Sequence, residues 1–149
     1  MSHDQIRNFI ADTCNSLDKC NFNNFLKMCS KEFKYTISIY SPDLLKDMVW
    51  LEHDINGLKT LFEELPEHLQ RKGKLLRHLS FPFIESTEDN IKVSTSFCLY
   101  NTELDGKSSI LCVGHYNDEI SVSENYYLLE ERIVYLDTRD IGVGLHVPI

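Results

Sequence analysis

Residues 126–137, with the sequence YYLLEERIVYLD, place apolar side chains on both faces of one predicted strand. Successive side chains of a strand point to opposite faces of the sheet. One face then carries three aliphatic residues, a glutamate and an arginine, namely Leu128, Val134, Leu136, Glu130 and Arg132. The other face carries two tyrosines, two aliphatic residues and a glutamate, namely Tyr127, Leu129, Ile133, Tyr135 and Glu131. A sheet built from such strands has to be covered on both faces.

Most of the chain upstream of this strand is also predicted to be extended. The candidate strands are residues 33–40, 46–52, 75–84, 91–102 and 108–120. Turn-forming sequences separate them. Asp105-Gly106, between two alternating runs, is the strongest hairpin signal in the chain. The second half of the sequence therefore predicts a long antiparallel meander.

Three helices are predicted in the first half of the chain. Residues 1–19 begin with a capping-box pattern at Ser2 and Gln5, and their apolar side chains follow one stripe. A shorter helix is predicted around residues 22–29. Asp54 is a suitable N-cap for a third helix, which Gly73 ends. Helices followed by strands indicate an α+β fold, in which the helices pack on one side of a strongly curved sheet.

Three helices can cover only one face of such a sheet. The second face is therefore a predicted protein–protein interface, with Glu130 and Arg132 as a candidate partly buried ion pair. Residues 70–78, QRKGKLLRH, concentrate basic groups in an acidic chain. This segment is either a solvated corner between helix and strand or a surface that docks on an acidic partner.

The composition indicates one soluble domain spanning residues 1–149, with a net charge of −8. This charge disfavours binding to nucleic acid or to an anionic membrane. No apolar run approaches the roughly 18 residues that span a bilayer. The N-terminal residues lack the pattern of a signal peptide. Five cysteines without a CxxC pair are typical of reduced thiols, so a cytoplasmic protein is predicted.

Motifs for metal, nucleophile or phosphate chemistry are absent from the sequence. Cys112 and His115 have the spacing of half a Rieske motif, but the upstream C-x-H half is missing. On a strand these two side chains also point to opposite faces. The chain contains no G-x-S-x-G sequence and no glycine-rich phosphate loop.

An acid–base function is harder to dismiss, because a curved sheet can enclose a pocket in which one carboxyl, imidazole or phenol group moves protons. The candidates are His78, Tyr100, His115, Tyr116 and Asp118. Each of them also has a structural interpretation, as a hydrogen-bonded core or interface residue.

Three strands of the C-terminal half together resemble one known family. Arg77-His78 lies on the first, Val113-Gly114 and Asp118 lie on the second, and the last runs from Arg132 to Leu136-Asp137. Their order and spacing resemble those of the small (β) subunits of aromatic-ring-hydroxylating, Rieske-type non-haem iron oxygenases. The resemblance spans about residues 30–140.

This resemblance implies a cone-shaped fold of the nuclear-transport-factor-2-like type, with a strongly curved mixed sheet and N-terminal helices packed on it. It implies no cofactor in this chain, because the large (α) subunit of such oxygenases carries the [2Fe–2S] Rieske cluster and the mononuclear iron. It also implies an α3β3 assembly with large subunits and further copies of this chain, and an indirect relation to electron-transfer components.

We therefore predict a non-catalytic small subunit of a multicomponent mono- or dioxygenase. The predicted structural or interface residues are Arg77, His78, Tyr116, Asp118, Arg132 and Asp137. One alternative is a stand-alone isomerase, dehydratase or cyclase of the same fold that uses a pocket Asp, His or Tyr. Another is a homodimeric module that binds a small apolar ligand. The substrate of the complex stays open among aromatic acids, salicylate-like compounds and small sulfonates.

Overall fold

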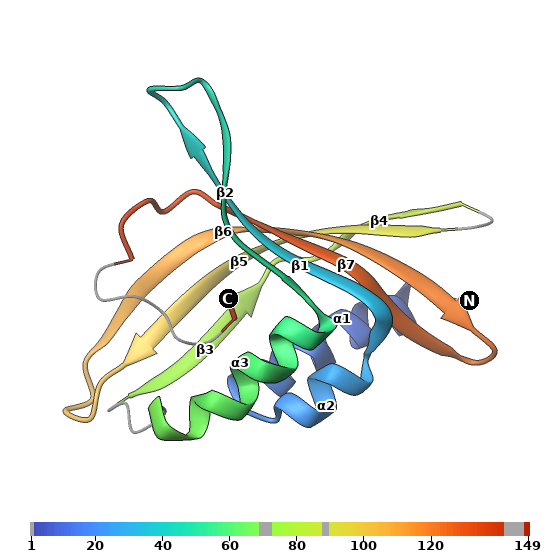
Figure 1. Ribbon diagram of the computed structural model, residues 1–149, viewed down its shortest axis with the longest axis horizontal. Helices are drawn as coiled ribbons and strands as arrows, with labels where there is room; N and C mark the ends of the chain where they lie inside the picture. The colour runs from blue at the N-terminus through green and yellow to red at the C-terminus, as the bar shows by residue number, and fades with distance from the viewer. Residues whose placement is uncertain (1, 69–72, 88–89, 142–147) are drawn as a thin grey trace.

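The computed structural model describes residues 2–68, 73–87, 90–141 and 148–149, except the side chains of residues 66–68 (Figure 1). Residues 70–72 of the basic segment lie outside this description. The described elements are α1 (His3–Asp18), α2 (Phe22–Lys27), β1 (Cys29–Ser41), β2 (Lys46–Asp54), α3 (Ile55–His68), β3 (Lys74–Leu79), β4 (Phe83–Ser86), β5 (Ile91–Thr102), β6 (Ser108–Ser123) and β7 (Tyr126–Leu136).

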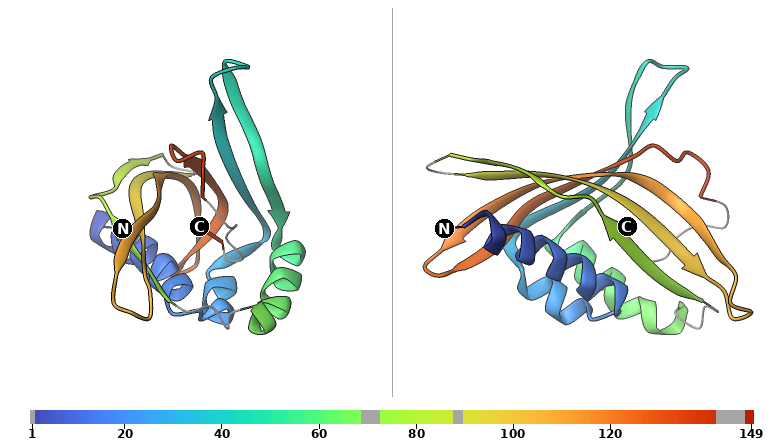
Figure 2. Two further views of the ribbon diagram at one scale, coloured as in Figure 1. Left: turned by 90° about the vertical axis from the view of Figure 1, so that its left-hand side faces the viewer. Right: turned by 180° about the vertical axis from the view of Figure 1, so that it is seen from behind.

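The strands form one curved, mixed sheet in the order β2-β1-β7-β6-β5-β3, with β4 paired to β5. The pairing of β1 with β7 is parallel, and the other pairings are antiparallel. The three helices lie on the concave side of the sheet, whereas no described helix covers the convex side (Figures 1 and 2). The predicted α+β class and the curved mixed sheet are confirmed.

Local sequence signals explain where the helices begin. Ser2 Oγ accepts a hydrogen bond from the Gln5 amide at 3.4 Å, and the Gln5 side chain accepts one from the Ser2 amide at 3.1 Å. These two bonds complete the predicted capping box. Asp54 Oδ1 accepts a bond from the Gly57 amide at 2.7 Å at the start of α3. The inner stripe of α1 consists of the buried residues Ile6, Ile10, Cys14 and Leu17.

A glycine in β6 allows the neighbouring strand β7 to approach it closely. A Cβ atom placed on Gly114 would lie 2.1 Å from the backbone oxygen of Tyr135 and 3.1 Å from the Cα of Leu136. No side chain tolerates such a distance, so the close approach of β7 to β6 requires glycine at this position.

A β-bulge in β7 corrects the predicted faces of the last strand. Ile120 pairs with Leu129 whereas its neighbour Glu119 pairs with Glu131, so Glu130 is an extra residue on β7. A bulge of this kind shifts the alternation by one residue. Leu129 is consequently fully buried on the inner face together with Arg132, while Leu128 is only half-buried. The prediction that Leu128 shares the face of Arg132 was therefore wrong.

The end of β1 and most of β2 leave the body of the molecule as a hairpin, residues 40–50, which we call the arm. The predicted strand over residues 46–52 is confirmed within β2. The tip of the arm stands clear of the other elements in all three views (Figures 1 and 2). The arm is therefore a projection and not part of the core.

Candidate functional site

The deepest polar group of the interior is an ion pair between β6 and β7. Arg132 Nε donates to Asp118 Oδ1 at 2.7 Å, and Arg132 Nη2 donates to Asp118 Oδ2 at 2.8 Å. Both side chains are completely buried. The pair forms because Asp118 and Arg132 are direct cross-strand partners on the inner face. Their contact is bidentate, which is the strongest geometry available to an arginine and a carboxylate.

The remaining atoms of Arg132 contact neighbours from two other elements. Nη2 also donates to Thr13 Oγ1 on α1 at 2.9 Å, and the guanidinium lies 4.5 Å from the ring centre of Tyr116. The Tyr116 ring stacks in turn on Phe97 of β5, with their centres 4.3 Å apart. Burial alone would lower the pKa of Arg132, but the Asp118 carboxylate, together with Cys14 and Tyr116, raises that pKa well above its ordinary value. Arg132 is therefore a permanent cation that joins helix and sheet.

A second buried pair joins β3 to the end of α1. Arg77 of β3 is bonded to Asp18, the last residue of α1, through its Nη1 and through its backbone amide. Arg77 Nη2 also donates to the carbonyl oxygen of Pro148 at 2.6 Å. Arg77 thus fixes three segments that are far apart in the sequence.

Pro148 and Ile149 occupy the hollow side of the sheet (Figure 1). Ile149 is only 1% exposed and belongs to the hydrophobic core, and its carbonyl oxygen accepts a 3.0 Å hydrogen bond from Tyr35 Oη. The place where an enzyme with this curvature would hold a substrate is therefore filled by the chain itself.

The interior groups are poorly suited to moving protons. Burial raises the pKa of Tyr35 and of Tyr116 far above the ordinary value of 10.0, so both phenols stay protonated. Both oxygens of Asp118 already accept bonds from Arg132. Tyr116 Oη has no hydrogen-bond partner within the described part of the chain. Among the interior residues that the structure describes, the arrangement holds charges in place and presents no poised base.

Three of the five acid–base candidates, His78, Tyr100 and His115, lie outside the interior. The His78 ring packs against Tyr100 with centres 4.9 Å apart, and the His115 ring stacks on Tyr135 at 5.0 Å. Both ring pairs are on the convex face, because their inward neighbours Arg77 and Tyr116 are buried. Asp137 is exposed, and its amide donates to the Val113 carbonyl at 3.0 Å.

The predicted ion pair between Glu130 and Arg132 was also wrong. The Glu130 carboxylate accepts hydrogen bonds from Ser30 and Ser121 at 2.6 and 2.5 Å, while Arg132 pairs with Asp118. The bulge turns Glu130 away from the inner face, and this separates it from Arg132.

Sequence reasoning missed the partners Asp18 and Thr13 and the role of residues 148–149. Asp18 and Thr13 lie on the predicted first helix, but only the packing of that helix on the sheet brings them to the arginines. No local sequence pattern predicts such contacts between a helix and distant strands.

Cys112 is completely buried whereas His115 is half-buried, so the two point to opposite faces, as predicted. Within the described ranges no three His, Cys, Asp or Glu side chains gather closely enough to hold a metal ion. Among the same residues no helix has the length and apolar character needed to cross a bilayer.

No family model matches the chain, but comparison with individual known proteins identifies its family. The β subunit of 2-aminobenzenesulfonate 2,3-dioxygenase from an Alcaligenes species is 31% identical over 145 residues, covering 97% of each chain. The β subunit of methanesulfonate monooxygenase hydroxylase from Methylosulfonomonas methylovora is 27% identical, covering 98% of this chain and 86% of the relative.

A solved structure shares the fold. It is assigned as the β subunit of an aromatic-ring-hydroxylating dioxygenase from Novosphingobium aromaticivorans, and it superimposes with a TM-score of 0.84 at 20% identity, covering 98% of this chain and 95% of its own. The full-length sequence similarity and the shared fold support the same family, and the filled interior agrees with it. The chain belongs to the family of the β subunits of aromatic-ring-hydroxylating, Rieske-type oxygenases.

Proposed function

We propose that this chain is the non-catalytic small subunit of a multicomponent Rieske-type oxygenase and holds the iron-bearing large subunits in an α3β3 assembly. The single observation that carries this proposal is the 31% identity over 97% of both chains with a β subunit of such a dioxygenase. The Rieske cluster and the mononuclear iron would then lie in the large subunit, which electron-transfer components reduce.

The interior supports this function over the isomerase, dehydratase or cyclase alternative. An enzyme of that kind needs an ionisable group facing a space that admits substrate. Here Asp118 is held by Arg132, and Pro148-Ile149 occupies the hollow. We therefore assign Arg77, Tyr116, Asp118 and Arg132 to structural roles in the interior.

The convex face supports the same function, because a subunit needs an uncovered surface for its partners. His78 lies on this face, and Asp137 is exposed directly after β7. We assign both to contacts between subunits. We also propose that the chain works in the cytoplasm with its complex, which its five cysteines without a CxxC pair support.

We further propose that the substrate of the complex is an organic sulfonate. The two relatives are subunits of oxygenases named for 2-aminobenzenesulfonate and for methanesulfonate. The sulfonate group is their common chemistry. The large subunit would bind it, so this chain would affect substrate choice only indirectly.

The test is to purify the chain alone and together with the Rieske-type large subunit encoded in the same genome. Alone it should be colourless and should not consume oxygen with either sulfonate. The co-purified complex should be brown and should consume oxygen in the presence of a sulfonate and an electron donor. Failure to bind the large subunit, or turnover of a ketone by the isolated chain, would overturn the proposal.

A further inference from the structure

One edge of the buried Arg77 guanidinium is only half used. Nη1 binds Asp18 and lies off this edge, while Nη2 donates to the Pro148 carbonyl oxygen at 2.6 Å. Nε, which shares the edge with Nη2, is buried and has no hydrogen-bond partner within the described part of the chain. A buried donor without a partner is costly. The edge therefore lacks one acceptor oxygen.

Arg132 shows what the same edge binds when both of its donors are used. Its Nε and Nη2 donate to the two oxygens of the Asp118 carboxylate at 2.7 and 2.8 Å. Two parallel hydrogen bonds to one anion are the strongest arrangement that a guanidinium makes. A single peptide oxygen, such as that of Pro148, fills only one of the two positions. The edge of Arg77 thus matches an oxyanion better than it matches a peptide carbonyl.

Two phenol groups add donors close to this edge. Tyr35 Oη donates to the Ile149 carbonyl oxygen at 3.0 Å, so Arg77 and Tyr35 bind consecutive residues of the chain. Tyr116 Oη is completely buried and has no partner among the described residues. The site therefore offers more donors than Pro148 and Ile149 supply acceptors.

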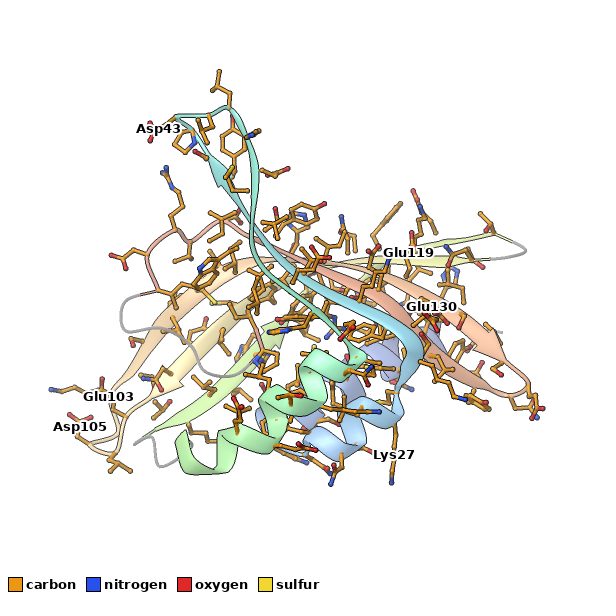
Figure 3. All side chains as sticks on the ribbon, viewed as in Figure 1. Lys27, Asp43, Glu103, Asp105, Glu119 and Glu130 are labelled. Atoms are coloured by element: carbon orange, nitrogen blue, oxygen red, sulfur yellow. The ribbon has the colours of Figure 1, made fainter. Side chains whose placement is uncertain are left out.

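The buried arginines favour a negative charge at these donors. Burial raises the pKa of both phenols most, but Arg77 and Arg132 both act to lower it, which places the two phenol oxygens near these cations. Four carboxylates of the sheet lie away from the hollow, with Glu103 and Asp105 at one end and Glu119 and Glu130 at the other (Figure 3). An anion is therefore favoured in the hollow although the net charge of the chain is −8.

The two residues that now occupy the site have the chemical outline of a small apolar anion. Their carbonyl oxygens meet Arg77 and Tyr35 at one end. At the other end the Ile149 side chain belongs to the hydrophobic core and is 1% exposed. Binding sites for small molecules combine an apolar lining with a few polar groups that fix the orientation of the ligand. Removing Pro148 and Ile149 would expose both features together.

We propose that Arg77, Tyr35 and Tyr116 form a binding site for a small organic carboxylate or sulfonate, whose oxygens replace the carbonyl oxygens of Pro148 and Ile149. The oxyanion takes the Nε and Nη2 edge of Arg77, and its apolar body takes the place of the Ile149 side chain. The site binds its ligand without transforming it. This inference goes beyond the proposed function and does not rest on it, because the site lies within one chain.

The first test is a calorimetric titration of the isolated full chain with benzoate and with benzenesulfonate. The control ligand is benzamide, which has the shape of benzoate without its charge and should bind at least tenfold more weakly than the better anion. The comparison of the two anions decides between a carboxylate and a sulfonate. A chain that ends at residue 147 should bind the better anion at least tenfold more tightly than the parent. Equal binding of benzamide, or no binding of either anion to either chain, would overturn the inference.

Two substitutions test the donors. Arg77→Lys keeps the cation but loses the two-donor edge, so it should weaken anion binding at least tenfold. Tyr35→Phe removes one oxygen and should weaken it about three- to tenfold. The control Tyr126→Phe changes an exposed residue at the start of β7 and should leave the affinity unchanged. Circular dichroism shows whether each variant is folded. Binding that survives Tyr35→Phe and a folded Arg77→Lys at full strength would place the anion elsewhere.

Methyl NMR of the parent chain locates the ligand without altering the interior. The Ile149 methyl signal, assigned by its loss in Ile149→Val, should shift when the better anion is added. The control is the Ile110 signal, which should stay in place because Ile110 lies on the outer side of the sheet and is 60% exposed. An unmoved Ile149 signal at saturating anion would overturn the inference, whatever the outcome for the large subunit.

Discussion

Removing the cation of the buried pair tests the structural role of the interior. Arg132 and Asp118 are both 0% exposed and share two hydrogen bonds of 2.7 and 2.8 Å. Arg132→Met leaves the Asp118 carboxylate buried without its counter-ion. Breaking a buried pair from one side costs about 3–5 kcal/mol. We expect the free energy of unfolding to fall by that amount.

The double variant separates the pair itself from the cost of an orphaned charge. Arg132→Met with Asp118→Val replaces both ions by apolar side chains, and such replacements are often neutral. We expect it to recover to within about 1–2 kcal/mol of the parent. The control is Lys92→Met, which breaks an exposed ion pair with Glu119 and should cost about 1 kcal/mol or less.

The assay is urea unfolding followed by circular dichroism. Fluorescence is unsuitable, because the single tryptophan, Trp50, lies on the exposed arm. The reasoning is refuted if Arg132→Met costs no more than Lys92→Met. It is equally refuted if the double variant is no more stable than Arg132→Met alone.

Three further predictions concern the core and the sheet. Burial raises the pKa of the Cys29 thiol from 9.0 to about 12, so the unfolded chain loses this proton first as the pH rises. The thiol's contribution to the free energy of unfolding should therefore be complete below pH 9 and should have fallen by about 1.4 kcal/mol at pH 10. Urea titrations of Cys29→Ala should show a loss smaller by about that amount, because Cys112, whose pKa burial raises to about 11, loses its own contribution in both proteins. Ile149→Ala should lower the free energy of unfolding in urea by about 2–4 kcal/mol, because the side chain is buried in the core. The control is Leu104→Ala on an exposed turn, and an equal loss in that variant would contradict the packing of Ile149 in the interior. Gly114→Ala should abolish soluble expression or lower the thermal midpoint of unfolding sharply. The control is Gly106→Ala, which has open space around it but a φ of +86° and should cost about 1 kcal/mol. Similar thermal midpoints for the two variants would disprove the close approach of β7 to Gly114.

Local patterns predicted most of the elements, although the single strand expected over residues 75–84 is two strands, β3 and β4. The capping box at Ser2 and Gln5, the N-cap at Asp54 and the alternation of residues 33–40 depend on neighbours in sequence, and the structure has a helix or a strand at each place. The hairpin at Asp105-Gly106 is also present, with Gly106 at positive φ.

Long-range features were beyond such patterns. The extra residue at Glu130 shifts the alternation of β7, and a bulge depends on the register with β6 and not on the strand's own sequence. The wrong partner for Arg132 followed directly from that shift. The parallel pairing of β1 with β7 and the return of Pro148-Ile149 into the core also join residues about 100 positions apart.

The family resemblance and the physical reasoning depended on different observations. The resemblance used the order of Arg77-His78, Val113-Gly114 and the last strand, whereas the interface was predicted from the two apolar faces of residues 126–137. The relatives establish the family. The contacts of the convex face stay a prediction, because the sequence does not say which partner covers it.

Native mass spectrometry of the co-expressed complex tests the central claim most directly. We predict equal numbers of large and small subunits, three of each, with all of the iron retained by large subunits when collisions release this chain. A small subunit that carries iron, or one that never appears in a complex with the large subunit, would contradict the account.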